Sequence, residues 1–136
     1  MRTKIVQKAL VGAALLLAFS DYAGYKIHYS VSVNTSSRTA FGSTGDARAS
    51  ANSTESIGCY IAQNSATSEV LFGGCNATDV NGNSVYCYFP SAVVNSYAKV
   101  LAANGSNAYY FFQWDASSAC TYVYSTTASD FTPLTP

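Results

Sequence analysis

The chain has 136 residues, a length that fits one domain and leaves no room for a second hydrophobic core. Only 10% of the residues are charged, and the seven basic side chains are balanced by seven acidic ones. A protein that binds nucleic acid through its phosphates needs a basic surface, so this composition excludes a conventional binder of that kind. The aromatic content of 14% disfavours a disordered chain.

The N-terminus has the pattern of a secretory signal peptide. Arg2, Lys4 and Lys8 precede a short apolar run over residues 9–19. This run is shorter than the roughly 20 residues that span a bilayer. A basic start followed by a short apolar run is typical of a bacterial signal peptide. We expect cleavage after Ser20, with Ala23 as the competing site. Residues 21–136 then form a single domain that is secreted or periplasmic and does not insert into the membrane.

Four cysteines follow the predicted cleavage site, at Cys59, Cys75, Cys87 and Cys120. An even number of cysteines in a short exported domain indicates two disulfides, which can be connected in three ways. The cysteines lack the tight C-x-x-C pairs typical of a zinc site, and no histidine lies near them. We therefore expect two disulfides and no bound metal.

A hairpin argument places two of these cysteines. Asn81-Gly82 is the dipeptide of a type I′ hairpin turn, in which both residues have positive φ. Folding the chain about that turn sets Cys87 opposite Asn76. Cys75 and Cys87 should then point to opposite faces of the sheet, because side chains alternate along a strand.

The second turn completes the pairing. A wider turn over Asn64–Ser68 brings Cys59 opposite Cys75, on the same face. The favoured bonds are then Cys59–Cys75 and Cys87–Cys120. A change of one residue in either turn reverses the faces, so the other connectivities stay open.

The first part of the expected domain contains one strand and a polar segment. Residues Tyr25–Val33 alternate between apolar and polar side chains, which predicts a half-buried strand. Residues 34–56 are rich in Ser, Thr, Ala, Asn and Gly and are predicted to be loose. A structureless stretch of this length is unusual inside a compact domain. It is either a tether or the site of a short edge strand near Thr39–Gly42.

The compact core is expected over residues 57–131. Ile57–Gln63, Val70–Ala77 and Ser84–Phe89 are predicted to form an antiparallel meander. A helix capped by Ser91 should run to Ala103, because apolar residues recur there at helical spacing. The final hairpin joins 108–114 to 119–125 through Asp115–Ser118. The predicted fold class is α+β, an antiparallel sheet of five to six strands with one helix packed on a face.

Four short segments carry a resemblance to known proteins: Ile57-Gly-Cys-Tyr60, Val85-Tyr-Cys87, Phe112-Gln-Trp-Asp115 and Ala119-Cys-Thr121. In these segments and in the order of its elements, the chain resembles uncharacterised small secreted two-disulfide bacterial proteins. The similar region covers residues 40–133. No activity is known for that group, so the resemblance implies no function and no site residues.

The sequence offers little catalytic chemistry. His28 is the single histidine, and it lies on the polar side of the first predicted strand. The chain lacks a G-x-S-x-G nucleophile motif, a P-loop and a dinucleotide fingerprint. A glycosidase would need two carboxylates that flank one bond, and the candidates all fall in predicted loops: Glu55, Glu69, Asp79 and Asp115. We therefore predict a protein that is not an enzyme and that has no cofactor.

Tyrosine is the feature that stands out, with eleven copies in the chain. Many of them lie on predicted strands, where half-buried tyrosines are common. One helix can cover only one face of a sheet, so the second aromatic face needs a partner or a ligand. The predicted binding face consists of Tyr60, Tyr86, Tyr88, Tyr109, Tyr110, Trp114, Tyr122 and Tyr124.

These observations favour an exported, non-catalytic binding domain that uses its Tyr/Trp-rich face for a glycan, envelope or protein ligand. One alternative is an inhibitor of an exported protease or lysozyme that inserts Asn64–Ser68 or Asp115–Ser118 into its target. Another is a surface subunit that assembles with copies of itself through the first strand.

Overall fold

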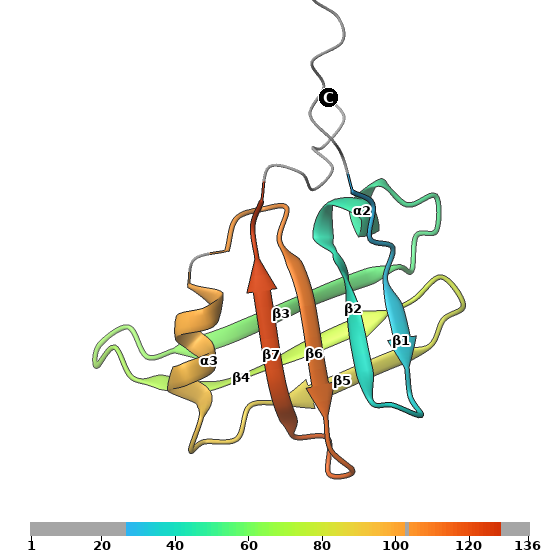
Figure 1. The fold of residues 1–136 in the computed structure, drawn as a ribbon. Helices are drawn as coiled ribbons and strands as arrows, with labels where there is room; N and C mark the ends of the chain where they lie inside the picture. The colour runs from blue at the N-terminus through green and yellow to red at the C-terminus, as the bar shows by residue number, and fades with distance from the viewer. Residues whose placement is uncertain (1–26, 103, 129–136) are drawn as a thin grey trace, which may run out of the picture.

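Two antiparallel sheets make up the fold. The computed structural model describes residues 27–102 and 104–128; the predicted signal peptide lies outside them. Seven strands in this part form a four-stranded sheet, in the order β1-β2-β6-β7, and a three-stranded sheet, in the order β3-β4-β5 (Figure 1). The elements are β1 Ser32–Asn34, β2 Thr39–Ser43, α2 Thr44–Ala49, β3 Ser56–Gln63, β4 Val70–Thr78, β5 Ser84–Tyr88, α3 Val94–Leu101, β6 Tyr109–Trp114 and β7 Cys120–Thr126. The prediction of one sheet with five to six strands is therefore wrong.

The two sheets pack face to face, and their strands run across one another (Figure 1). The interface is apolar. Its fully buried side chains include Phe112 of β6 and three of the four cysteines, Cys75, Cys87 and Cys120. Each sheet thus buries the inner face of the other. A single sheet with one helix could not bury both of its faces in this way.

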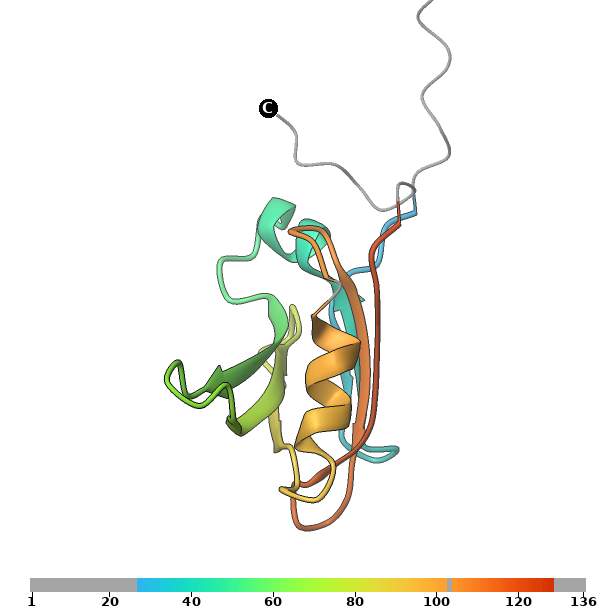
Figure 2. The ribbon, with the colours of Figure 1, turned by 90° about the vertical axis from the view of Figure 1, so that its left-hand side faces the viewer.

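Helix α3 lies at one side of the molecule, between the two sheets rather than on a sheet face (Figure 2). Val94 is buried, and Tyr97 and Leu101 pack against the core. The helix begins later than predicted, because Val93 occupies the N-cap position without a side-chain hydrogen bond. Pro90 starts a turn there, accepting a hydrogen bond from the Val93 N–H at 2.9 Å. Ser91 therefore does not cap the helix.

The first predicted strand is shorter than expected. Of its residues, 25 and 26 lie outside the described part, and only 32 and 33 belong to β1. The predicted alternation nevertheless holds, because Ile27, Tyr29 and Val31 are more buried than the residues between them. The Ser43 N–H of β2 donates to the Tyr29 carbonyl at 2.9 Å, and two carboxylates also hold this backbone. Asp46 accepts from the Tyr29 N–H, and Glu55 accepts from the Val31 N–H at 2.6 Å.

Residues 34–56 are not a loose tether. They contain β2 and α2, and β2 lies between β1 and β6 rather than at a sheet edge. Small residues let β2 pack closely. A side chain at Gly42 would come within 2.9 Å of the Val31 backbone, and Gly42 has a φ of 158°. Ala40 beside it is fully buried.

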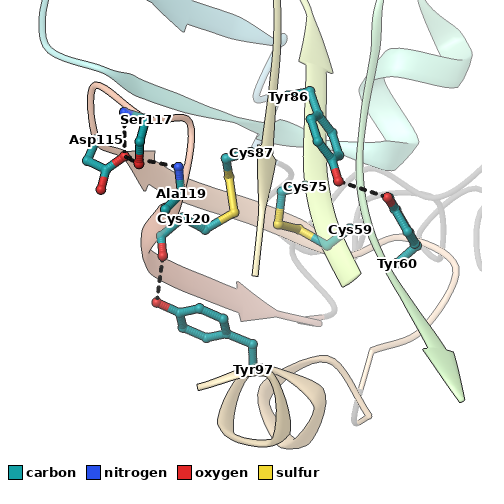
Figure 3. Close-up of a disulfide and its surroundings, with 10 residues drawn as sticks. All are labelled: Cys59, Tyr60, Cys75, Tyr86, Cys87, Tyr97, Asp115, Ser117, Ala119 and Cys120. Atoms are coloured by element: carbon teal, nitrogen blue, oxygen red, sulfur yellow. Dashed lines mark hydrogen bonds between the residues drawn. A yellow bond between two sulfur atoms is a disulfide. The ribbon is translucent and has the colours of Figure 1, made fainter. Parts of the chain in front are cut away.

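The disulfides are Cys59–Cys75 and Cys87–Cys120, the pairing that the sequence favoured (Figure 3). The register predicted between two of these cysteines is wrong. Cys75 lies directly opposite Cys87 on β5 as well as opposite Cys59 on β3. These three side chains therefore share the inner face of the three-stranded sheet. Cys87–Cys120 joins β5 to β7 and so links the two sheets covalently.

The register differs because the turn between β4 and β5 is wider than a type I′ turn. Only Gly82 of the Asn81-Gly82 pair has a positive φ, at 82°. The last paired residues are Thr78 and Ser84. The Asp79 carboxylate organises the loop between them, accepting hydrogen bonds from the N–H groups of Asn81 and Asn83, each at 2.9 Å.

This loop makes stability depend on pH. The Asn83 side-chain amide, with smaller contributions from backbone N–H groups, holds the pKa of the Asp79 carboxyl below its ordinary 3.8. Because the pKa is lower in the folded state than in the unfolded state, the ionised carboxylate stabilises the protein at pH values above the unfolded-state pKa. This contribution is lost as the pH falls through the lowered pKa of the folded state. We expect Asp79→Asn to reduce the free energy of unfolding at pH 7 by about 1–2 kcal/mol and to flatten its acid dependence below pH 3.8.

Urea unfolding between pH 7 and pH 2.5 measures both effects. Glu69→Gln is the matched control, because the Glu69 side chain is exposed in the other loop of the meander. If both variants gave the same pH curve, Asp79 would not have the role assigned to it.

Candidate functional site

The eight residues of the predicted binding face do not lie on one face. Three of them point outward from the four-stranded sheet: Tyr109, Tyr122 and Tyr124. Three others point outward from the three-stranded sheet: Tyr60, Tyr86 and Tyr88. The remaining two, Tyr110 and Trp114, point inward. The prediction of one Tyr/Trp-rich face is therefore corrected to two tyrosine-rich faces on opposite sides of the domain, without the tryptophan.

Trp114 and Tyr110 belong to the core. Tyr110 is 9% exposed. The Trp114 ring is partly buried and packs against Phe112, with ring centroids 6.0 Å apart. Both residues alternate with the outward-facing residues of β6, so the pleat of the strand explains their position.

The outer face of the four-stranded sheet carries a groove of about 490 Å³. We call its lining the four-stranded aromatic face: Tyr109, Phe111, Gln113, Tyr122 and Tyr124. The strand register brings these residues together, since Phe111 lies opposite Tyr124 and Gln113 lies opposite Tyr122. Tyr122 and Tyr124 keep 49% and 44% of their surface exposed, although both are large aromatic residues.

Ring contacts hold the side chains of this groove in place. Phe111 meets Tyr122 edge to face, with centroids 5.9 Å apart. Tyr109 meets Tyr124 in the same way at 6.4 Å, and Tyr29 packs on Tyr109 at 4.8 Å. Such edge contacts are favourable beyond the area they bury. The groove is thus formed by rings whose orientations are fixed before any ligand binds.

The groove has no formal charge, because every residue that lines it is aromatic or an amide. Burial raises the pKa of the Tyr109 phenol above its ordinary 10.0, and the neighbouring phenols of Tyr29 and Tyr124 raise it further. Tyr109 therefore stays protonated at neutral pH. The Gln113 amide adds both a hydrogen-bond donor and an acceptor to the surface.

The outer face of the three-stranded sheet is also aromatic. We call Tyr60, Phe72, Tyr86 and Tyr88 the three-stranded aromatic face; their exposed fractions range from 42% to 56%. The hydroxyls of Tyr60 and Tyr86 hydrogen-bond to each other at 3.1 Å (Figure 3). Tyr60 and Phe72 make an edge contact at 6.4 Å.

The residues considered for catalysis are apart from these faces. The His28 Nδ1 atom lies 2.9 Å from Asp46 Oδ1, and the His28 side chain is 69% exposed. Glu55 and Asp79 are buried acceptors of backbone N–H groups, as described above. Within residues 27–102 and 104–128, no three metal-binding side chains cluster.

The Asp115 loop is held rigidly at the end of β6. Its carboxylate accepts from the N–H groups of Ser117 and Ala119 at 2.8 and 3.0 Å (Figure 3). The Ser117 hydroxyl, together with these N–H groups, holds the pKa of the Asp115 carboxyl below its ordinary 3.8. The carboxylate thus closes the predicted turn.

Three aromatic or amide residues of these surfaces were absent from the predicted set: Phe111, Gln113 and Phe72. Alternation along β6 was a usable signal for the first two, because it places 109, 111 and 113 on one face. Alternation along β4 also sends Phe72 outward, because it lies three residues before Cys75, whose side chain points inward.

Comparison with protein-family models, with curated proteins and with solved structures finds no match. Neither helix in the described part of the chain is long and apolar enough to cross a membrane. The two disulfides fit an oxidising compartment outside the cytosol.

Proposed function

We propose that the protein is an exported, non-catalytic binding domain and that its four-stranded aromatic face binds an uncharged glycan. The observation that carries this proposal is the groove lined by Tyr109, Phe111, Gln113, Tyr122 and Tyr124. Binding sites for small ligands combine apolar, aromatic walls with a few polar groups, and this groove has that composition.

The chemistry of a sugar suits this surface. A pyranose ring presents C–H groups on its faces and hydroxyls around its rim. The exposed rings of Tyr122 and Tyr124 offer flat apolar surfaces for the former, and the Gln113 amide can exchange hydrogen bonds with the latter. A groove without charged residues gives no electrostatic gain to an anionic polymer, so the proposal is restricted to neutral glycans.

Export is supported by the two disulfides and by the signal pattern over residues 1–20. Two covalent cross-links help the domain to keep its binding surface folded outside the cytosol. Its low content of charged residues agrees with a surface that works through aromatic contacts and neutral polar groups.

Retention of the purified protein on insoluble polysaccharides tests the proposal. We expect it to bind cellulose or chitin, which are uncharged, in preference to anionic peptidoglycan. Tyr122→Ala with Tyr124→Ala should weaken this binding at least about tenfold, equivalent to about 1.4 kcal/mol. Tyr86→Ala with Tyr88→Ala is the matched control, because it removes a second Tyr-x-Tyr pair of similar exposure from the opposite face.

Two results would contradict the proposal. One is the absence of retention on both neutral polymers. The other is an equal loss of binding in the two double variants. Light scattering on the same samples separates glycan binding from self-association, which would raise the particle mass in the absence of any polysaccharide.

A further inference from the structure

The hydrogen-bonded tyrosine pair on the three-stranded aromatic face brings together two strands that are not neighbours. Tyr60 belongs to β3 and Tyr86 to β5, and β4 runs between them. Their hydroxyl oxygens are 3.1 Å apart above that central strand (Figure 3). It is the one pair of tyrosines whose hydroxyls bond to each other among the hydrogen bonds that join described residues.

Gly74 of β4 allows the two rings to meet. It lies opposite Tyr60 in the sheet, so the position beneath the pair has no side chain. A methyl group at Gly74 would lie 2.8 Å from Cε2 of Tyr86 and 2.9 Å from its hydroxyl oxygen. The Tyr86 ring therefore fills the space above Gly74, and its Cε2 atom, next to the hydroxyl, faces β4. The pair is held by the backbone of three paired strands.

We propose that Tyr60 and Tyr86 form a site of oxidative cross-linking, at which a peroxidase with hydrogen peroxide joins them as dityrosine. Haem peroxidases carry out such one-electron oxidations. In dityrosine the two phenol rings are joined at the carbons next to their hydroxyls, so that the two oxygens lie side by side. The hydroxyls of Tyr60 and Tyr86 already have that arrangement.

The reaction balances with one molecule of peroxide. Each phenol gives one electron and one proton to the oxidant, and hydrogen peroxide is reduced to two molecules of water. The two phenoxyl radicals pair their unpaired electrons in a carbon–carbon bond. Each coupled carbon then transfers its hydrogen as a proton to the oxygen of its own ring, which restores two phenols. The protein loses two hydrogen atoms in total.

Proximity favours this pair over the other exposed tyrosines. Two reacting groups that are held in contact react as if at very high concentration. Tyr88 has the same 42% exposure as Tyr60 and lies on the same face, but it has no such hydroxyl contact with another described residue. Tyr122 and Tyr124 are also exposed, so their coupling to a second molecule is the competing reaction.

Treatment of the dilute, disulfide-bonded protein with a haem peroxidase and limiting hydrogen peroxide tests the proposal. We expect a monomer that is lighter by two hydrogen atoms and that has dityrosine fluorescence, with one linked peptide pair containing Tyr60 and Tyr86. Tyr60→Phe and Tyr86→Phe should each abolish the lighter monomer. Tyr88→Phe is the control and should leave its yield unchanged.

The variants remove single exposed hydroxyls, so they are expected to fold, and circular dichroism before oxidation confirms this. Dityrosine that appears only in covalent dimers would overturn the proposal, as would a lighter monomer at full yield in Tyr60→Phe or Tyr86→Phe. The result does not depend on what the four-stranded aromatic face binds.

Discussion

Replacing Cys87 and Cys120 together with alanine is expected to lower the free energy of unfolding by about 4 kcal/mol. The bond closes a segment of 33 residues, and a disulfide stabilises a protein mainly by restricting its unfolded chain. It also joins the two sheets, which are otherwise held together mainly by side-chain packing and by the Tyr88 N–H, which donates to the Ser118 carbonyl at 3.0 Å. Urea denaturation followed by circular dichroism measures the change, and the midpoint should fall without a change in the secondary structure of the folded state.

The second disulfide supplies the control for this experiment. Cys59 and Cys75 lie opposite each other on neighbouring strands and close a segment of only 16 residues. Their joint replacement with alanine should cost about 3 kcal/mol. Because β3 and β4 remain paired by backbone hydrogen bonds, the sheet itself should survive. If this variant were the less stable of the two, the inter-sheet bond would not be the dominant covalent tie.

Phe112→Ala is expected to destabilise the protein by about 3–5 kcal/mol, the range found when a buried aromatic side chain is truncated. Phe112 has no exposed surface and lies at the interface of the two sheets. Its removal leaves a cavity that the paired strands around it cannot close. Thermal and urea unfolding measure the loss, and exposure of the apolar interior can be followed by dye binding.

The neighbouring residue gives a matched comparison. Phe111 has the same side chain but points to the outer groove, where it is partly exposed. Phe111→Ala should cost no more than about 2 kcal/mol, because less apolar surface is buried there. Equal losses for the two variants would contradict the inward and outward directions assigned to β6.

Local patterns of the sequence predict the elements of the C-terminal two thirds well. The structure confirms the three strands of the meander and the last hairpin within a residue or two of the predicted bounds. Their turns have strong local signals, such as Asp115, whose carboxylate closes the β6–β7 loop. The pairing of the cysteines could also be predicted, because it depends on the order of strands and turns along the chain.

The number of sheets could not be read from these patterns. Alternation of apolar and polar residues shows that a strand has a buried face, but not which strand covers it. The segment 39–43 was hard to recognise because its buried residues, Ala40, Gly42 and Ser43, are small or polar. Close packing against Val31 requires that small size and removes the hydrophobic signal at the same time.

The outward direction of some tyrosine side chains could be predicted from the sequence. Tyr60, Tyr86 and Tyr88 are each adjacent to a cysteine whose side chain points inward, so alternation sends them outward. The same argument fails on β7. Cys120 and Val123 are both buried although they are three residues apart, because the register shifts between Gln113 and Trp114 of the paired strand. Such a bulge reverses the alternation, and the sequence does not indicate it.

The row of Cys59, Cys75 and Cys87 across one sheet has a consequence for oxidative maturation. The central sulfur has a possible partner on either side, but the backbone spacing differs between the two. The Cα atoms of Cys59 and Cys75 are 4.0 Å apart, the short spacing of a pair without mutual backbone hydrogen bonds, which places Cys75 and Cys87 at the wider spacing. A growing or translocating chain also presents Cys59 and Cys75 before Cys87 emerges. Cys59 is therefore the first partner available to Cys75, and its bond to Cys75 leaves Cys87 to bond with Cys120 across the two sheets.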